Sequence, residues 1–248
     1  MNDSQPKYRI ALNASQLSIL HDLYKFRFAT SDLLMKSQGL KTKRYLYVRL
    51  KILCDQQYIG RKYDSSYRLQ NKYATYHLLK KGIDALKENP VFDKQVLANI
   101  ARDKTRSDKF ITHSLNIFMV YIDFKRLYGD RFRFFTDSYL RGYDYFPDPA
   151  PDAYLQFKED ESQHYFIVFI EESILYFVRQ NRIKKYIDYA RSKKWLDETD
   201  SEMPTVIIIC EKESLRYSVE HQVKKAHGDQ LTYINFVVTT RDRLARGI

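Results

Sequence analysis

The 248-residue chain contains little cysteine and little glycine, and this scarcity excludes several classes of function. Its two cysteines, Cys54 and Cys210, are too few for a disulfide framework and cannot form a CxxC zinc site. Seven isolated glycines leave no GxxxxGK[ST] phosphate loop and no GxSxG nucleophile elbow. The six histidines include no HxH or HExxH pair, so the usual spacing of zinc ligands is missing as well.

Long apolar runs are also missing. No run approaches the roughly 18 residues that a membrane helix needs, and residues 1–30 lack the apolar stretch and cleavage site of a signal peptide. We therefore expect a cytoplasmic protein with no membrane partner. A hydrophobic content of 44% with 29% charged residues indicates a folded core, in one large domain or two small ones.

Basic residues are abundant and unevenly placed. The chain has 42 lysines and arginines against 31 aspartates and glutamates, a formal net charge of +11. Residues 1–89 hold 17 of the basic and 7 of the acidic side chains, whereas residues 90–248 hold 25 and 24. A local excess of this kind is typical of a protein that binds a polyanion such as nucleic acid.

The pattern over residues 13–87 predicts three short helices followed by a hairpin. Asn13, with Gln16 three residues later, forms a capping-box signature, and Thr30 and Thr42 are predicted to cap the second and third helices. Three leucines at i, i+4 and i+7, namely Leu46, Leu50 and Leu53, predict the buried face of the third helix. The helices two and three are predicted to be joined by residues 39–41, about the length of a helix-turn-helix turn.

Three helices followed by a basic hairpin is the element order of a winged helix, which we expect over residues 1–89. In that fold the third helix enters the major groove and the hairpin lies along the phosphate backbone. The residues expected to contact double-stranded DNA are Lys41, Thr42, Lys43, Arg44, Tyr47, Lys51, Arg61, Lys62 and Arg68. The alternative is that these residues form an ordinary solvated basic face.

Pro90 predicts a domain boundary, followed by a connector over residues 90–106. A second domain over residues 107–248 then has the order α-β-β-β-α-β-α-β, which predicts a mixed sheet covered by helices. Ser107 is predicted to cap its first helix, and the residues expected to point inward from that helix are Phe110, Leu115, Phe118, Met119, Ile122 and Leu127. His113 lies in the same helix and, as a lone helical histidine, is assigned no catalytic role. The fold class is therefore α+β with two domains.

Two carboxylates open a further possibility. Asp152 begins one predicted strand after Pro151, and Glu171 ends the next strand. This order resembles the core of the PD-(D/E)XK nuclease superfamily, and the resemblance implies a divalent metal held by the two carboxylates, which activates water. Magnesium prefers oxygen ligands, so the side chains are of the right chemical type.

Residues 12–195 also resemble the replication-relaxation family of bacterial plasmids and integrative elements. The matching features are the winged-helix start, His113-Ser114-Leu115-Asn116, Pro151-Asp152-Ala153, Ile170-Glu171 and Arg182-Ile183-Lys184-Lys185-Tyr186. Membership implies a DNA-binding accessory protein for plasmid or mobile-element relaxation, replication or conjugative transfer. A relaxase or another transfer or replication protein is then the expected protein partner.

The nuclease motif is incomplete, because Ser173 stands where those enzymes place a lysine after the second acidic residue. Arg182 and Lys185 on the following helix are the available basic side chains, but an arginine is a poor base near neutral pH. We therefore expect a degenerate nuclease-like domain, no cleavage and no cofactor, with Mg²⁺ at Asp152 and Glu171 only if the site is active. The alternatives are a metal-dependent endonuclease and a winged-helix transcription regulator, with a homodimer as one option for the oligomeric state.

Overall fold

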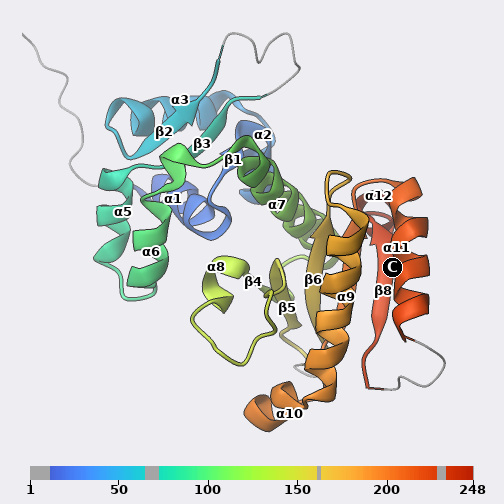
Figure 1. Cartoon of the computed structure of the whole chain (residues 1–248). Helices are drawn as coiled ribbons and strands as arrows, with labels where there is room; N and C mark the ends of the chain where they lie inside the picture. Colours follow the sequence, from blue (N-terminus) through green and yellow to red (C-terminus); the bar gives the residue numbers. More distant parts are fainter. Residues whose placement is uncertain (1–11, 65–72, 161–162, 228–232, 248) are drawn as a thin grey trace, which may run out of the picture. The chain divides into compact units, whose positions relative to one another are not determined.

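The computed structural model describes residues 12–64, 73–160, 163–227 and 233–247, and the chain divides into two compact units (Figure 1). The first unit comprises Met1–Arg106 and the second Ser107–Ile248. Each unit contains both helices and strands, which confirms the predicted α+β class. No helix within the described ranges is both long enough and apolar enough to cross a membrane.

The first unit packs its helices around a small antiparallel sheet with the strand order β1-β3-β2. Its elements are α1 (Ala14–Phe26), β1 (Ala29–Thr30), α2 (Ser31–Ser37), α3 (Arg44–Asp55), β2 (Ile59–Lys62), β3 (Thr75–Leu78), α5 (Lys80–Lys87), α6 (Lys94–Ile100) and a 3-10 turn (Asp103–Thr105). Fully buried leucines of three helices, Leu20, Leu34 and Leu46, contribute to its core.

The first two helix starts follow the predicted caps. Asn13 Oδ1 accepts a hydrogen bond from Gln16 N at 2.9 Å, and Gln16 Oε1 accepts one from Asn13 N at 3.0 Å. Thr30 Oγ1 accepts from Leu33 N at 3.3 Å. The predicted cap of the third helix is wrong: α3 begins at Arg44 after Lys43, which already has helical backbone angles, and the joint to α2 spans residues 38–43.

The segment predicted as a connector, residues 90–106, is a packed part of the first unit. Helix α6 buries Leu97 and Ile100 completely, and α6 contacts α5. Asp103 is nearly inaccessible and forms an ion pair with Arg27, whose Nε donates to Asp103 Oδ2 at 2.7 Å. The apolar face of α6 and the Arg27–Asp103 pair join this segment to the rest of the unit, and the polar, basic composition of 90–106 does not reveal either contact.

The second unit is built on a five-stranded mixed sheet with the strand order β4-β5-β6-β7-β8. Its elements are α7 (Asp108–Tyr128), β4 (Phe132–Thr136), α8 (Asp137–Leu140), β5 (Ala153–Phe157), β6 (His164–Ile170), α9 (Tyr176–Arg191), α10 (Lys194–Thr199), β7 (Thr205–Cys210), α11 (Glu213–His227), β8 (Phe236–Thr240) and α12 (Arg241–Leu244). The first three strands pair antiparallel and the last three pair parallel, so the predicted mixed sheet is confirmed.

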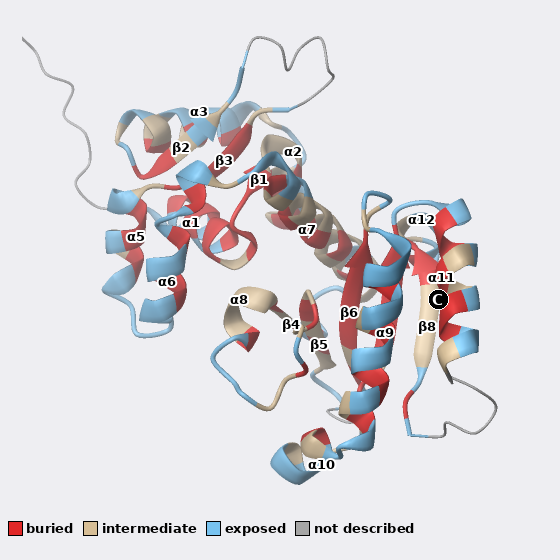
Figure 2. Ribbon diagram, in the orientation of Figure 1, coloured by how far each residue is buried: buried red, intermediate tan, exposed pale blue. Residues whose placement is uncertain are grey.

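Helices cover both faces of this sheet. Phe166, Val168 and Ile170 of β6 pack in one cluster with residues of α9 and α11. On the opposite face, Tyr121 of α7 packs its ring on Phe132 and Phe134, at centroid distances of 5.9 and 5.5 Å. Central strand β6 is therefore buried along nearly its whole length, as Figure 2 shows.

The predicted inward face of α7 is mostly wrong. Of the six residues expected there only Phe118 is buried, whereas Phe110, Leu115, Met119, Ile122 and Leu127 are half-buried. The buried residues are Ile111, Ser114, Ile117, Phe118, Val120 and Phe124. Apolar residues surround most of this helix, so the 3.6-residue period does not select one face.

Candidate nucleic-acid interface and carboxylate cluster

Helix α3 has one buried side and one exposed basic side. Leu46, Leu50 and Leu53 are at most 2% exposed. Arg44 lies two positions before Leu46, and Lys51 lies two positions before Leu53. In a helix this spacing places the two basic residues on the side opposite the leucines, and both are exposed. In Figure 2 much of the α3 ribbon has the colour of exposed residues.

The other predicted DNA contacts near α3 differ in exposure and in whether they already form an ion pair. Lys41, Thr42 and Tyr47 are exposed, and Tyr47 Oη lies 3.4 Å from Ser31 Oγ of α2. Lys43 pairs with Asp32 at 3.2 Å, and that carboxylate also binds Lys36 at 2.8 Å. The charge of Lys43 is therefore partly neutralised within the unit.

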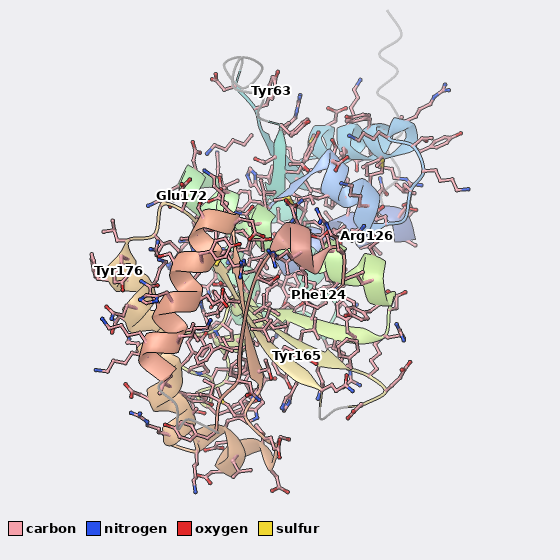
Figure 3. All side chains as sticks on the ribbon, turned by 90° about the vertical axis from the view of Figure 1, so that its right-hand side faces the viewer. Tyr63, Phe124, Arg126, Tyr165, Glu172 and Tyr176 are labelled. Atoms are coloured by element: carbon pink, nitrogen blue, oxygen red, sulfur yellow. The ribbon has the colours of Figure 1, made fainter. Side chains whose placement is uncertain are left out.

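The hairpin carries its cations on β2. Arg61 is exposed and its guanidinium carbon lies 4.8 Å from the ring centroid of Tyr63, a cation–π contact. Tyr63 lies just beyond β2 (Figure 3). Lys62 is half-buried, and Arg68 lies outside the described residues.

Asp152 and Glu171 meet at one edge of the large sheet. Asp152 directly precedes β5 and Glu171 directly follows β6, and these strands run antiparallel, so the two residues lie at the same end. Main-chain hydrogen bonds hold Asp152 to strand β6 and to the start of α8: Asp152 N donates to Ile167 O at 2.9 Å, and Asp137 N donates to Asp152 O at 3.0 Å.

His113 of α7 lies between the two carboxylates. Its Nδ1 is 2.5 Å from Glu171 Oε1, and its Nε2 is 3.3 Å from Asp152 Oδ1. Arg182 of α9 donates from Nη2 to the same Asp152 oxygen at 3.1 Å, and Phe169 N donates to the other oxygen, Oδ2, at 2.6 Å. We call His113, Asp152, Glu171 and Arg182 the carboxylate cluster.

The cluster favours the charged forms of His113 and Asp152. Burial disfavours the imidazolium, but hydrogen bonds to Asp152 and Glu171 outweigh burial and raise the pKa of His113 to about 10. Burial likewise opposes ionisation of Asp152, but the Arg182 guanidinium and the His113 hydrogen bond lower its pKa to about 2. Two cations therefore face two carboxylates at neutral pH.

Sequence reasoning found three members of the cluster and missed His113. Lys185 is exposed, and the structure does not bring it to the carboxylates. Ser173 is exposed too, and neighbouring Glu172 forms an ion pair with Lys212. His113 is 39 positions from Asp152, and one signal that could reveal it is the correct inward face of α7, next to buried Ile111 and Ser114.

The side chains of the cluster do not fit a magnesium ion. The oxygens of Asp152 already accept hydrogen bonds from Arg182, His113 and Phe169 N. A divalent cation would have to displace an imidazolium and a guanidinium from the carboxylates. Across the described ranges, no group of three or more His, Cys, Asp or Glu side chains is arranged to hold a metal.

Comparison of the chain with protein-family models, curated proteins and solved structures finds no match. The assignment of function therefore depends on the chain's own residues and their geometry.

Proposed function

We propose that the first unit is a winged helix that binds double-stranded DNA, with α3 as the recognition helix. The support is the element order: three helices, α1 to α3, precede a hairpin of β2 and β3, whose sheet is completed by β1. In such a fold α3 enters the major groove, and hairpin cations such as Arg61 contact the phosphate backbone.

The observation that carries this proposal is the exposed basic side of α3. Arg44 and Lys51 lie opposite the buried leucines, and Lys41 precedes the helix, in a region with 17 basic and 7 acidic residues. DNA is a polyanion, so cations that align on one exposed helix gain free energy by releasing its counterions.

The second unit supports an accessory role. Apart from the short helices α8, α10 and α12, its order of one helix, three strands and then alternating helices and strands matches that of a PD-(D/E)XK nuclease-like fold, which we propose here in a degenerate form. Together the two units favour membership of the replication-relaxation family, and a role in plasmid or mobile-element relaxation, replication or transfer. A relaxase is the protein partner that this role implies. A DNA footprint at a transfer origin would support the role, whereas one at a promoter would indicate a transcription regulator.

DNA binding is tested with fluorescence anisotropy on labelled duplexes. The double variant Arg44→Ala/Lys51→Ala should bind about tenfold or more weakly, because two charge contacts are lost. The slope of log affinity against log salt concentration should become shallower by up to about 2, since each phosphate contact contributes about 0.9 to that slope.

The matched control is Lys224→Ala/Lys225→Ala, which removes two exposed lysines from α11 of the second unit. Its affinity and salt dependence should equal those of the wild type. Unchanged DNA binding in the α3 variant, with its helical circular dichroism intact, would contradict the winged-helix proposal.

A further inference from the structure

The outermost line of α3 has an apolar residue at its centre. Arg44, Val48 and Lys51 follow one another at i, i+4 and i+7, on the side opposite the buried leucines. Val48 is 54% exposed, so it contributes little to the core of the unit. Tyr45 and Tyr47 lie to either side of this line and are 69% and 50% exposed.

An exposed valine has no evident structural reason at this position. Valine is a weaker helix former than alanine, lysine or glutamine, because its branched side chain restricts χ1. Arg44 and Lys51 lie about one helical turn from Val48, one on each side. This face of α3 therefore has two cations that attract a polyanion and, between them, a small apolar surface. Val48 would pack favourably on a partner that presents an apolar group among charged ones.

The major groove of DNA presents one such group. Base edges there display hydrogen-bond donors and acceptors, apart from the C5 methyl group of thymine. Valine has no hydrogen-bonding atom in its side chain, so it can distinguish bases only by packing on that methyl group. Arg44 and Lys51 would meanwhile contact phosphates or guanine acceptors.

We propose that Val48 reads a thymine methyl group, so that the preferred DNA site has thymine at the step that faces the centre of α3. This inference rests on the proposed DNA binding through α3. A cytosine that carries a C5 methyl presents the same group in the groove, and the site should accept it better than unmodified cytosine.

The test begins with a randomised duplex library, from which the full chain selects its preferred sequence. That duplex is then synthesised with deoxyuridine in place of thymidine at one position at a time, which removes only the methyl group. At one or two positions the wild type should bind the uracil duplex about fourfold more weakly than the thymine duplex. This is the loss of affinity expected when one buried methyl group is removed.

Val48→Ala should discriminate between the thymine and uracil duplexes by no more than about twofold, because its shorter side chain makes less contact with the methyl group, and Val48→Asn should shift the preference toward adenine, to which an amide can bind. The control is Val91→Ala, another exposed valine of the first unit, which should keep the wild-type discrimination. Alanine is the stronger helix former, so Val48→Ala should retain the circular dichroism of the wild type.

The outcomes separate this inference from the proposed function. DNA binding with equal affinity for thymine and uracil duplexes overturns the methyl contact and leaves DNA binding in place. Discrimination that is as strong in Val48→Ala as in the wild type also overturns the role of Val48. Binding that enriches no sequence overturns the methyl contact alone, whereas failure of the chain to retain any duplex contradicts both proposals.

Discussion

His113 connects helix α7 to the edge of the large sheet through ion pairs with Asp152 and Glu171. It contacts two carboxylates, and its side chain is 32% exposed against 12% for Asp152 and 17% for Glu171. Removing one charge from such a cluster leaves the opposite charges poorly solvated and incompletely paired, at a cost of about 3 kcal/mol. The cluster therefore matters for stability even without a catalytic role.

The stability of the second unit should depend on pH through this histidine. The pKa of His113 is 6.5 in a solvated chain and about 10 in the fold, so its contribution is complete below pH 6.5 and is lost as the pH rises through 10. For Asp152 the pKa falls from 3.8 to about 2, so its contribution is present above pH 3.8 and is lost toward pH 2. Both contributions are complete between about pH 4 and pH 6.5.

We expect the free energy of unfolding in urea, followed by circular dichroism, to fall by up to about 1.4 kcal/mol per pH unit between pH 7 and 10. The comparison is His113→Gln, which keeps hydrogen-bonding capacity but cannot gain a proton. It should be less stable at pH 6 and show a shallower decrease above pH 7. Parallel pH profiles for the two proteins would show that His113 is not held as the imidazolium.

At the scale of elements, the close approach of α5 to the start of β2 depends on one glycine. A Cβ atom at Gly82 would lie 2.3 Å from the carbonyl oxygen of Tyr58, which already accepts a hydrogen bond from Leu79 N at 3.0 Å. The Cβ atom is attached to the backbone of α5, and the oxygen belongs to the backbone of Tyr58, so the contact can be relieved only by a shift of the backbone. Gly82 is therefore required by packing although it lies inside a helix, where glycine is unfavourable.

Gly82→Ala should reduce the free energy of unfolding by about 2 kcal/mol, even though alanine alone would stabilise the helix by about 1 kcal/mol. Gly142→Ala is the control, because the nearest atom to its Cβ is 3.6 Å away, and its effect should stay within about 0.5 kcal/mol. Urea unfolding monitored by circular dichroism measures both. A Gly82→Ala protein as stable as the wild type would disprove the close contact.

The elements that could be predicted from sequence are those fixed by local interactions. Asn13 and Gln16 cap α1 over three residues, and the alternation of apolar runs with helices locates the strands of the large sheet. The inward face of α7 and the pairing of Arg27 with Asp103 depend on contacts between distant segments. The place of His113 in the carboxylate cluster depends on distant contacts too, since the cluster joins a helix, two strand ends and a second helix.

At the scale of the whole molecule, charge and chemistry are divided between the units. Residues 1–89 hold the excess of basic side chains, whereas the second unit, residues 107–248, has 21 basic and 22 acidic residues. The candidate DNA contacts lie in the first unit and the carboxylate cluster lies in the second. Substitutions in the two sites should therefore have separable effects.

Asp152→Asn should reduce the free energy of unfolding by about 3 kcal/mol, because His113 and Arg182 lose the charge of their shared partner. Its affinity for duplex DNA, measured by anisotropy below the unfolding transition, should stay within about twofold of the wild type, because the contacts in α3 are unchanged. Arg44→Ala/Lys51→Ala should show the reverse: weaker DNA binding with unchanged stability, since both side chains are exposed.

The same proteins test the alternative of an endonuclease. With the oxygens of Asp152 bound by Arg182, His113 and Phe169 N, we expect no cutting of supercoiled plasmid in magnesium or manganese, as followed by gel electrophoresis. Cutting by the wild type that Asp152→Asn or Glu171→Gln abolishes would show that a metal displaces His113 and Arg182 when DNA binds. Cutting that survives both substitutions would indicate a contaminating nuclease, because neither carboxylate would then be needed for the reaction.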